Sequence, residues 1–169
     1  QAWGRDVVIS FDPNLRPRLW ASPDDMLDTL NQLANRCDWI LPGLAEGQLL
    51  SGREQPQDVA AFFLAQGAQR VIVKLGAAGA WYAEAAGGAS GQVPGCPVQA
   101  VLDSVGAGDG FAVGVISALL EGASTAAAVA RGNAIGARVV QFPGDSDGLP
   151  TRNELQRLMA EPAPSPLPA

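Results

Sequence analysis

Short strand-like runs alternate with helix-like segments in this chain, and that alternation limits the possible folds more than any other feature. The expected strands of the first half are β-branched or aromatic runs at residues 7–11, 38–41 and 70–75. The expected helices have apolar residues at helical spacing and lie at residues 22–36, 44–50 and 57–66. Continuous apolar strands separated by helices predict an α/β fold with a mostly parallel sheet covered on both faces.

The second half of the chain continues with strand signals and then becomes helical. A turn at residues 76–79 precedes a returning strand at 80–83, a small-residue loop at 86–91 and a short strand at 98–101. Three helices are expected after that, at residues 109–121, 125–140 and 151–159. Thr151 with Glu154 three residues on predicts a capping box for the last helix. The Pro-rich residues 162–169 are expected to be disordered.

Composition excludes several classes of function. The chain has 169 residues, of which 47% are apolar, and this is enough for a hydrophobic core. A net charge of −6 argues against a nucleic-acid partner, and the apolar runs are too short to predict a membrane span. Two cysteines without a CxxC motif are typical of a reduced, cytoplasmic protein.

The chain contains no histidine, and this limits its possible chemistry. Ser-His-Asp and Cys-His catalysis are excluded, as are zinc sites that use histidine. A general base must then be Asp, Glu or Lys.

Residues 103–109, Asp-Ser-Val-Gly-Ala-Gly-Asp, carry the sharpest chemical signal. Gly106 and Gly108 allow a tight turn at the start of a long helix, where unpaired N–H groups and the helix dipole favour an anion. Asp109 lies in the same turn. An unperturbed aspartate has a pKa of about 3.9 and is ionised at neutral pH, so a residue of this type can accept a proton. The alternative is a glycine-rich turn in which Asp109 caps the helix. The segment is neither a Walker A loop nor a dinucleotide GxGxxG motif.

The same segment resembles the C-terminal signature of the ribokinase-like (PfkB) carbohydrate kinases, which usually reads Asp-Thr-X-Gly-Ala-Gly-Asp. Ser104 stands here in place of Thr and keeps the hydroxyl. The resemblance implies an anion hole formed by Gly106, Ala107 and Gly108, with Asp109 as the base that activates the sugar hydroxyl. It further implies nucleotide contact for Ser104 and substrate contact for Asp103 and Asp109.

Two other segments resemble nucleotide-binding elements of that family. Residues 73–80 are similar to its strand–KxGxxG–strand element, which implies that Lys74, Gly76 and Gly79 lie beside the nucleotide phosphates. An ordinary hairpin with an exposed lysine is the alternative. Asn133 resembles a residue of the adenine-side helix, and the alternative is a polar residue tolerated in a helix of small residues.

Glu46 resembles the glutamate of an Asn-X-X-Glu motif that the family links to magnesium. Gly43 replaces the asparagine of that motif. A metal role for Glu46 is therefore one hypothesis, and a solvated glutamate in the first turn of a helix is the other.

Residues 11–20 resemble the Asp-X-Asn-X-Arg…Leu-Trp segment of 2-keto-3-deoxygluconate kinases and fructokinases, which implies substrate contact by Asn14 and Arg16. The planar, permanently charged Arg16 suits a carboxylate or a phosphate. The alternative is a turn followed by a surface charge. Residues 148–155 resemble the C-terminal segment of the ketodeoxygluconate branch.

The resemblance extends over about residues 7–158 and corresponds to the C-terminal portion of a ribokinase-like three-layer α/β/α fold, without the lid. It implies that residues 1–161 form a nucleotide-binding and catalytic portion that uses ATP and Mg²⁺. In the family an upstream region supplies the first strands, much of the sugar pocket and the lid. A chain without that region is expected to lack a complete sugar pocket and to expose apolar surface suited to a homo-oligomer.

Three functions remain open at this point. The first is an ATP-dependent sugar kinase, with 2-keto-3-deoxygluconate as the first choice of substrate and fructose as the second. The second is a truncated, non-catalytic nucleotide-binding module that works by association. The third, a Rossmann oxidoreductase, fits the α/β pattern alone, and the missing GxGxxG motif and histidine count against it.

Overall fold

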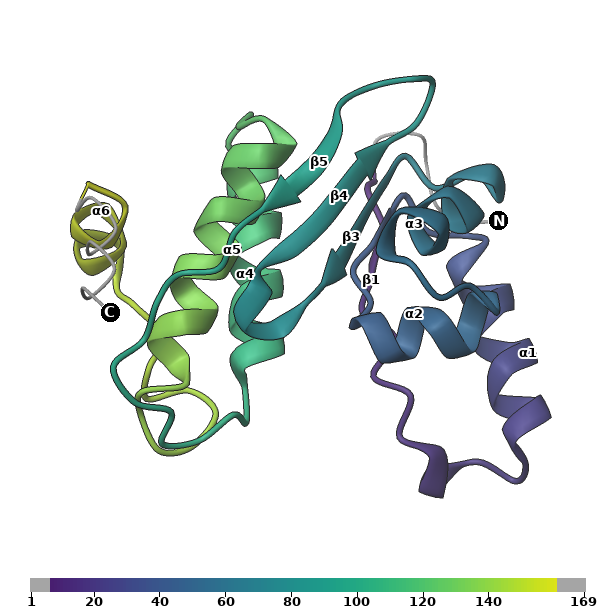
Figure 1. Cartoon of the computed structure of the whole chain (residues 1–169), viewed down its shortest axis with the longest axis horizontal. Coiled ribbons are helices and arrows are strands. Elements are labelled where there is room, and N and C mark those ends of the chain that lie inside the picture. Colours follow the sequence, from purple (N-terminus) through teal and green to yellow (C-terminus); the bar gives the residue numbers. More distant parts are fainter. Residues whose placement is uncertain (1–6, 161–169) are drawn as a thin grey trace. The chain divides into compact units, whose positions relative to one another are not determined.

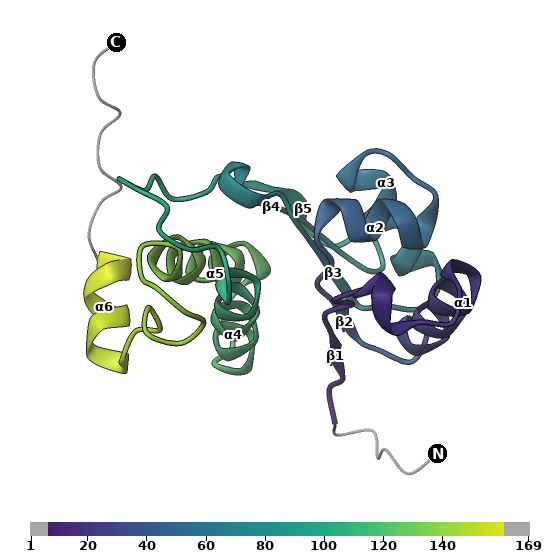
Figure 2. The ribbon, with the colours of Figure 1, turned by 90° about the horizontal axis from the view of Figure 1, so that it is seen from below.

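The computed structural model describes residues 7–160, so the tail expected to be disordered at residues 162–169 lies outside the described part of the chain. Contacts divide the chain into two compact units. Unit 1 contains the described residues up to Leu75 together with Trp81–Gln92. Unit 2 contains Gly76–Ala80 together with the described residues from Val93 onward. Figures 1 and 2 show the elements of both units in two views.

The described strands form one mixed sheet in the order β1-β2-β3-β4-β5. Their bounds are β1 Ser10–Phe11, β2 Trp39–Ile40, β3 Arg70–Lys74, β4 Ala80–Glu84 and β5 Ser90–Val93. Strands β1, β2 and β3 are parallel, with Ser10 opposite Trp39 and Trp39 opposite Arg70. Strands β4 and β5 follow β3 with alternating directions (Figure 1). The predicted α/β fold with a mostly parallel sheet is confirmed. Coverage of the sheet on both faces stays a prediction, because the helices of unit 1 lie on one side of β1, β2 and β3 (Figure 2).

Three helices cover the parallel strands of unit 1: α1 Pro23–Ala34, α2 Leu44–Ser51 and α3 Pro56–Ala65. Figure 2 shows all three on the same side of β1, β2 and β3. As predicted, Ser22 caps α1, because its hydroxyl accepts a hydrogen bond from the Asp25 N–H at 3.1 Å. Phe63 of α3 and Val71 and Val73 of β3 are fully buried in the core that joins the helices to the sheet.

Helices α4 (Ala107–Leu120) and α5 (Thr125–Val139) form the centre of unit 2, and α6 (Arg152–Ala160) follows them. Glycines allow α4 and α5 to approach closely, because a Cβ on Gly114 would lie 2.8 Å from the Cα of Gly132. Val115 and Val129 are fully buried between these helices. This close packing fixes the position of the first turn of α4, which contains part of residues 103–109, called the glycine motif below.

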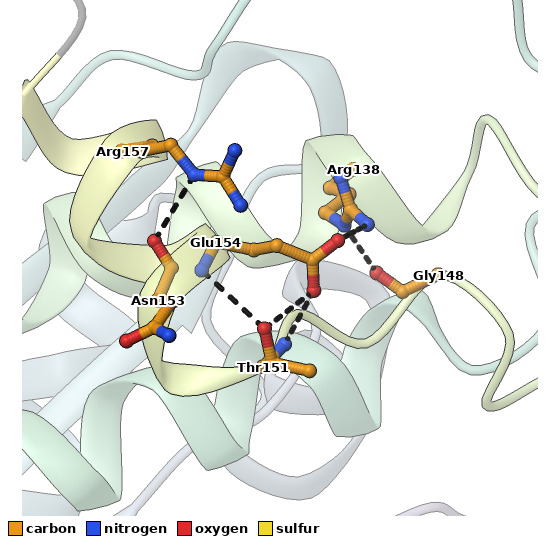
Figure 3. Close-up of polar contacts among 6 residues, drawn as sticks. All are labelled: Arg138, Gly148, Thr151, Asn153, Glu154 and Arg157. Atoms are coloured by element: carbon orange, nitrogen blue, oxygen red, sulfur yellow. Dashed lines mark hydrogen bonds and ion pairs between the residues drawn. The ribbon is translucent and has the colours of Figure 1, made fainter.

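The last helix begins with the predicted capping box, which Figure 3 shows. The Glu154 carboxylate accepts hydrogen bonds from the Thr151 N–H at 2.8 Å and from its hydroxyl at 2.7 Å. Arg138 of α5 pairs with the same carboxylate at 3.0 Å and donates to the Gly148 carbonyl. These contacts connect α6 to α5.

One predicted strand is absent from the structure, and one observed strand was not predicted. Residues 98–101 form no strand; Pro97, which has no N–H to donate, precedes them, and Val101 is exposed. Strand β5 instead begins inside the small-residue loop expected at residues 86–91. Ala86 and Gly87 both have positive φ, as in the hairpin turns that match the twist of paired strands, and the Glu84 N–H donates to the Ala89 carbonyl.

The first strand is shorter than predicted. Strand β1 covers Ser10–Phe11, whereas Val7 and Val8 are about half exposed and do not belong to it. Hydrogen bonds between the first segment and the region of β2 begin at Ile9, whose carbonyl accepts from the N–H groups of Asp38 and Trp39. Within residues 7–160, no helix combines the length and the hydropathy needed to cross a membrane.

Candidate active site

The glycine motif forms the turn that begins α4. Gly106 is the N-cap residue, with a left-handed φ of 77°, and the Gly110 N–H makes the first helical bond to its carbonyl at 2.8 Å. A Cβ on Gly106 would lie 2.4 Å from the carbonyl oxygen of Asp145, so conformation and space both require glycine. The helix starts at Ala107, two residues earlier than predicted, because the left-handed Gly106 directs the next residues into the first turn.

Asp109 therefore lies in the first turn of α4, and its side chain is exposed. The N–H groups of a first helical turn have no intrahelical partner, and they lie at the positive end of the helix dipole. The sequence supplies these amides from Ala107, Gly108 and Asp109, two of which have little or no side chain to block an anion. The turn thus combines an anion-binding backbone with a carboxylate that can accept a proton.

Asp103 holds this turn in place through both of its carboxylate oxygens. Oδ1 accepts the Val105 N–H at 2.9 Å, and Oδ2 accepts the Gly144 N–H at 3.2 Å. The hydrogen bonds from the backbone of Val105 and then of Gly144 lower the pKa of Asp103, because they stabilise its ionised form. Ser104 lies exposed beside it. In this structure the Asp103 carboxylate binds backbone, and substrate contact by Asp103 stays a prediction.

The turn after β3 is built on glycine as well. Gly76 and Gly79 have φ values of 60° and 93°, and the Gly79 N–H donates to the Gly76 carbonyl at 3.0 Å. A Cβ on Gly79 would lie 2.1 Å from the Val93 carbonyl oxygen, whereas a Cβ on Gly76 would meet open space. The backbone at Val93 and Gly95 thus packs directly on this turn.

Asn133 fixes the segment on which that turn packs. The side chain projects from α5, is 7% exposed, and donates through Nδ2 to the carbonyls of Val93 at 3.2 Å and Pro94 at 3.0 Å. The position of Asn133 beside the nucleotide stays a prediction. In the structure its side chain holds the Val93 backbone, which packs on Gly79.

Lys74, the last residue of β3, lies in unit 1 and forms an ion pair with Asp12. Their charged atoms are 2.5 Å apart, and the side chains are 17% and 18% exposed. The two residues lie at the same edge of the sheet, because β1 and β3 are both parallel to β2 and Asp12 directly follows β1. The sequence patterns indicated no role for Asp12. Its place directly after a parallel strand was the signal that could have predicted a position at this edge of the sheet.

The loop after Asp12 has an unusual backbone. Asn14 and Arg16 both adopt left-handed conformations, with φ values of 43° and 48°, and Leu15 between them is buried. The Leu15 carbonyl accepts a hydrogen bond from the Trp20 indole N–H at 2.7 Å, and the Leu15 N–H donates to the Glu46 carboxylate at 3.3 Å. Trp20 and Glu46 therefore hold the residues expected to contact the substrate.

Glu46 does not present a free carboxylate for a metal ion. Oε1 accepts the Leu15 N–H, and Oε2 accepts the Gly43 N–H at 2.8 Å. Among residues 7–160, no three acidic, cysteine or histidine side chains gather as metal ligands. Magnesium prefers carboxylates and phosphates with several waters around it. A metal ion at Glu46 would share each oxygen with a backbone hydrogen bond. Metal binding by Glu46 therefore stays a prediction, beside the backbone-holding contacts that the structure shows.

The predicted site residues divide between the two units. Unit 1 contains Asn14, Arg16, Glu46 and Lys74. Unit 2 contains Gly76, Gly79, Asp103, Ser104, Gly106, Ala107, Gly108, Asp109 and Asn133.

Comparison with known proteins connects these features to one family. A model of the pfkB family carbohydrate kinases matches residues 4–152. The 2-dehydro-3-deoxygluconokinase of Bacillus subtilis is 53% identical over 153 residues, which cover 90% of this chain and 47% of the relative. The chain spans about half the length of the curated relatives it matches.

Solved structures agree with that match. A PfkB protein from Polaromonas sp. JS666 is 55% identical with a TM-score of 0.77, covering 88% of this chain and 46% of that structure. A ribokinase II from E. coli, solved in complex with ATP and Mg²⁺, is 34% identical with a TM-score of 0.80, covering 90% of this chain and 48% of that structure. The predicted ribokinase-like fold is confirmed, and the chain belongs to the pfkB family of carbohydrate kinases.

Proposed function

We propose that this chain is the nucleotide-binding and phosphoryl-transfer portion of an ATP-dependent sugar kinase whose acceptor is 2-keto-3-deoxygluconate. The observation that carries the proposal is the first turn of α4, where Gly106 directs backbone amides and the Asp109 carboxylate into one exposed turn. Such a turn can bind the oxygens of a phosphoryl group and accept a hydroxyl proton. The B. subtilis relative, named a 2-dehydro-3-deoxygluconokinase, supports the choice of acceptor.

In the proposed reaction, Asp109 accepts the proton of the attacking sugar hydroxyl. The hydroxyl oxygen forms a bond to the γ-phosphorus as the bond to the β–γ bridging oxygen breaks, and ADP leaves with that oxygen. A carboxylate is a sufficient base, because phosphoryl transfer passes through a loose transition state with little demand for early deprotonation. The amides of residues 107–109 stabilise the charge on the transferring group.

Recognition of a sugar acid rests on Arg16. Its guanidinium can make two parallel hydrogen bonds to a carboxylate, which 2-keto-3-deoxygluconate has and fructose lacks. The left-handed backbone at Asn14 and Arg16 fixes the direction in which both side chains leave the loop. Conversion of Arg16 to Lys keeps the charge and loses the planar fork, so it separates recognition by geometry from recognition by charge.

The proposal is tested by an assay of ATP-dependent phosphorylation of 2-keto-3-deoxygluconate and of fructose, combined with calorimetric titration of ADP. When the upstream region that the longer relatives have is also present, we expect turnover of the sugar acid and a loss of it in the Arg16→Lys variant. Turnover of fructose alone would identify a fructokinase. ADP binding without turnover of either sugar would identify a non-catalytic nucleotide-binding module, and absence of both would contradict the proposal.

A further inference from the structure

The loop that carries Asn14 and Arg16 has two left-handed residues, a conformation that asparagine tolerates and that arginine does not favour. Both residues are non-glycine and left-handed, at φ 43° and 48°. Such residues persist where the surrounding structure fixes them, and they concentrate at functional sites. The contacts that impose this geometry are therefore part of the site.

Leu15, between the two left-handed residues, is fixed through both of its backbone polar groups. The Leu15 N–H donates to Glu46 Oε1 at 3.3 Å, and its carbonyl accepts from the Trp20 indole at 2.7 Å. The Leu15 side chain is 6% exposed and belongs to the core of unit 1. With its side chain, N–H and carbonyl all held, Leu15 anchors the residues on each side of it.

Glu46 connects this anchor to the next strand of the sheet. Its second oxygen accepts the Gly43 N–H at 2.8 Å, at the start of α2. Gly43 forms a bridge with Lys74 at the end of β3, and the Lys74 N–H donates to the Pro42 carbonyl at 2.8 Å. The Glu46 carboxylate thus joins the loop after β1 to the turn after β2, with one oxygen on each.

We propose that Glu46 is a positioning residue for the loop of Asn14 and Arg16, which it holds in the conformation that recognises the acceptor, and that it acts through these backbone bonds rather than as a metal ligand. The loop-holding part stands on the contacts described above. The link to the acceptor rests on the proposed function.

The first test is amide hydrogen exchange by NMR on the full chain and on Glu46→Gln. The variant keeps the size of the side chain and leaves one amide oxygen for two N–H donors. We expect exchange at the Leu15 and Gly43 amides to become about tenfold faster, as the loss of a charge-assisted hydrogen bond implies. The matched control is Glu54→Gln, which removes the same charge at an exposed position of unit 1.

Unit 2 amides report in the same spectra whether the variant is folded. Unchanged protection of Leu15 and Gly43 in a folded Glu46→Gln chain would overturn the proposal.

The second test titrates Mg²⁺ alone into the wild-type chain. A metal ligand at Glu46 predicts shifts of the Leu15 and Gly43 amide signals in the wild type that are absent in Glu46→Gln. A positioning residue predicts no such shifts in either chain, so shifts confined to the wild type would overturn the proposal.

The third test measures the affinity for 2-keto-3-deoxygluconate and for ADP by calorimetry. We expect Glu46→Gln to weaken sugar-acid binding in the same direction as Arg16→Ala, with unchanged ADP affinity. Weakened ADP binding with unchanged sugar-acid binding would contradict the positioning role. If Arg16→Ala has no effect on the sugar acid, the acceptor assignment fails, whereas amide exchange at Leu15 still decides what Glu46 does.

Discussion

Unit 1 and unit 2 hold their candidate site residues by different physical means. In unit 1, side chains fix the backbone: Glu46 and Trp20 hold Leu15, and Asp12 pairs with Lys74. In unit 2, missing side chains permit the geometry, because Gly79 and Gly106 leave no room for a Cβ. The difference predicts that unit 2 is sensitive to added atoms and that the loop of unit 1 is sensitive to lost hydrogen bonds.

The largest effect is expected from Gly79→Ala compared with Gly76→Ala. Both glycines have positive φ, so both variants carry the cost of a left-handed alanine, about 1–2 kcal/mol. At Gly79 the new Cβ would also meet the Val93 carbonyl oxygen at 2.1 Å, whereas at Gly76 it meets open space. We expect Gly79→Ala to lower the free energy of unfolding by roughly 3–5 kcal/mol, and Gly76→Ala by the smaller amount alone. Urea denaturation measures the free energy of unfolding of both variants. Equal decreases in the two would show that the close approach of the Val93 carbonyl to Gly79 does not affect stability.

Asn133, like Asp103, is an exception in unit 2, because its side chain fixes backbone. Its Nδ2 group donates to two carbonyls, so Asn133→Ala should lower the free energy of unfolding by about 1–3 kcal/mol. Asn133→Asp should lower it further, because a carboxylate has no hydrogen to donate to the carbonyls of Val93 and Pro94. Thermal unfolding of both variants checks the order. A more stable Asp variant would support the alternative of a merely tolerated polar residue.

Trp20→Phe tests whether side-chain hydrogen bonds fix the backbone of the loop in unit 1. The change keeps an aromatic ring and removes the indole N–H that bonds to Leu15 at 2.7 Å. We expect a loss of about 1 kcal/mol in the free energy of unfolding, with faster amide exchange in the loop of residues 12–16. Exchange rates in unit 2 are the internal control. Equal acceleration in both units would indicate a general loss of stability instead.

The smallest effect concerns pH. Hydrogen bonds from the Val105 and Gly144 backbone lower the pKa of Asp103 below its ordinary value of 3.8. A carboxyl whose pKa is lower in the folded chain stabilises the fold above its ordinary pKa, and the stabilisation is lost as the pH falls through the folded value. We therefore expect the unfolding temperatures of the wild type and Asp103→Asn to differ near neutral pH and to converge below pH 3.8. A constant difference down to acid pH would contradict this role.

Sequence patterns predicted the structural elements correctly where the local chemistry of neighbouring residues decides the structure. The Ser22 cap, the box of Thr151 and Glu154 and the parallel strands followed from residue types at fixed spacing. Strand β5 did not follow, because two positive φ values at Ala86 and Gly87 create its hairpin where small residues suggested a loop.

At the candidate site, too, features set by local backbone geometry were predicted and features set by distant contacts were not. The glycine motif indicated a turn at the start of α4, because glycine limits backbone geometry directly. Tertiary contacts could not be predicted from the sequence pattern. The residues of the Asp12–Lys74 pair are 62 positions apart, and those of the Leu15–Glu46 hydrogen bond are 31 positions apart. No local pattern encodes such pairs. Sequence similarity to the family suggested metal binding for Glu46, which stays a prediction, and it did not reveal the backbone hydrogen bonds that Glu46 accepts.

The most direct test of the central claim compares phosphoryl transfer by the wild type and Asp109→Asn, with the upstream region of the longer relatives present in both proteins. ADP affinity and unfolding temperature are measured on both. Asparagine keeps the shape of the side chain and cannot accept the hydroxyl proton. We predict a fall in turnover of about 10²–10⁴-fold, typical of the loss of a general base, with unchanged ADP affinity and stability. Turnover by Asp109→Asn equal to that of the wild type would contradict the assignment of Asp109 as the catalytic base.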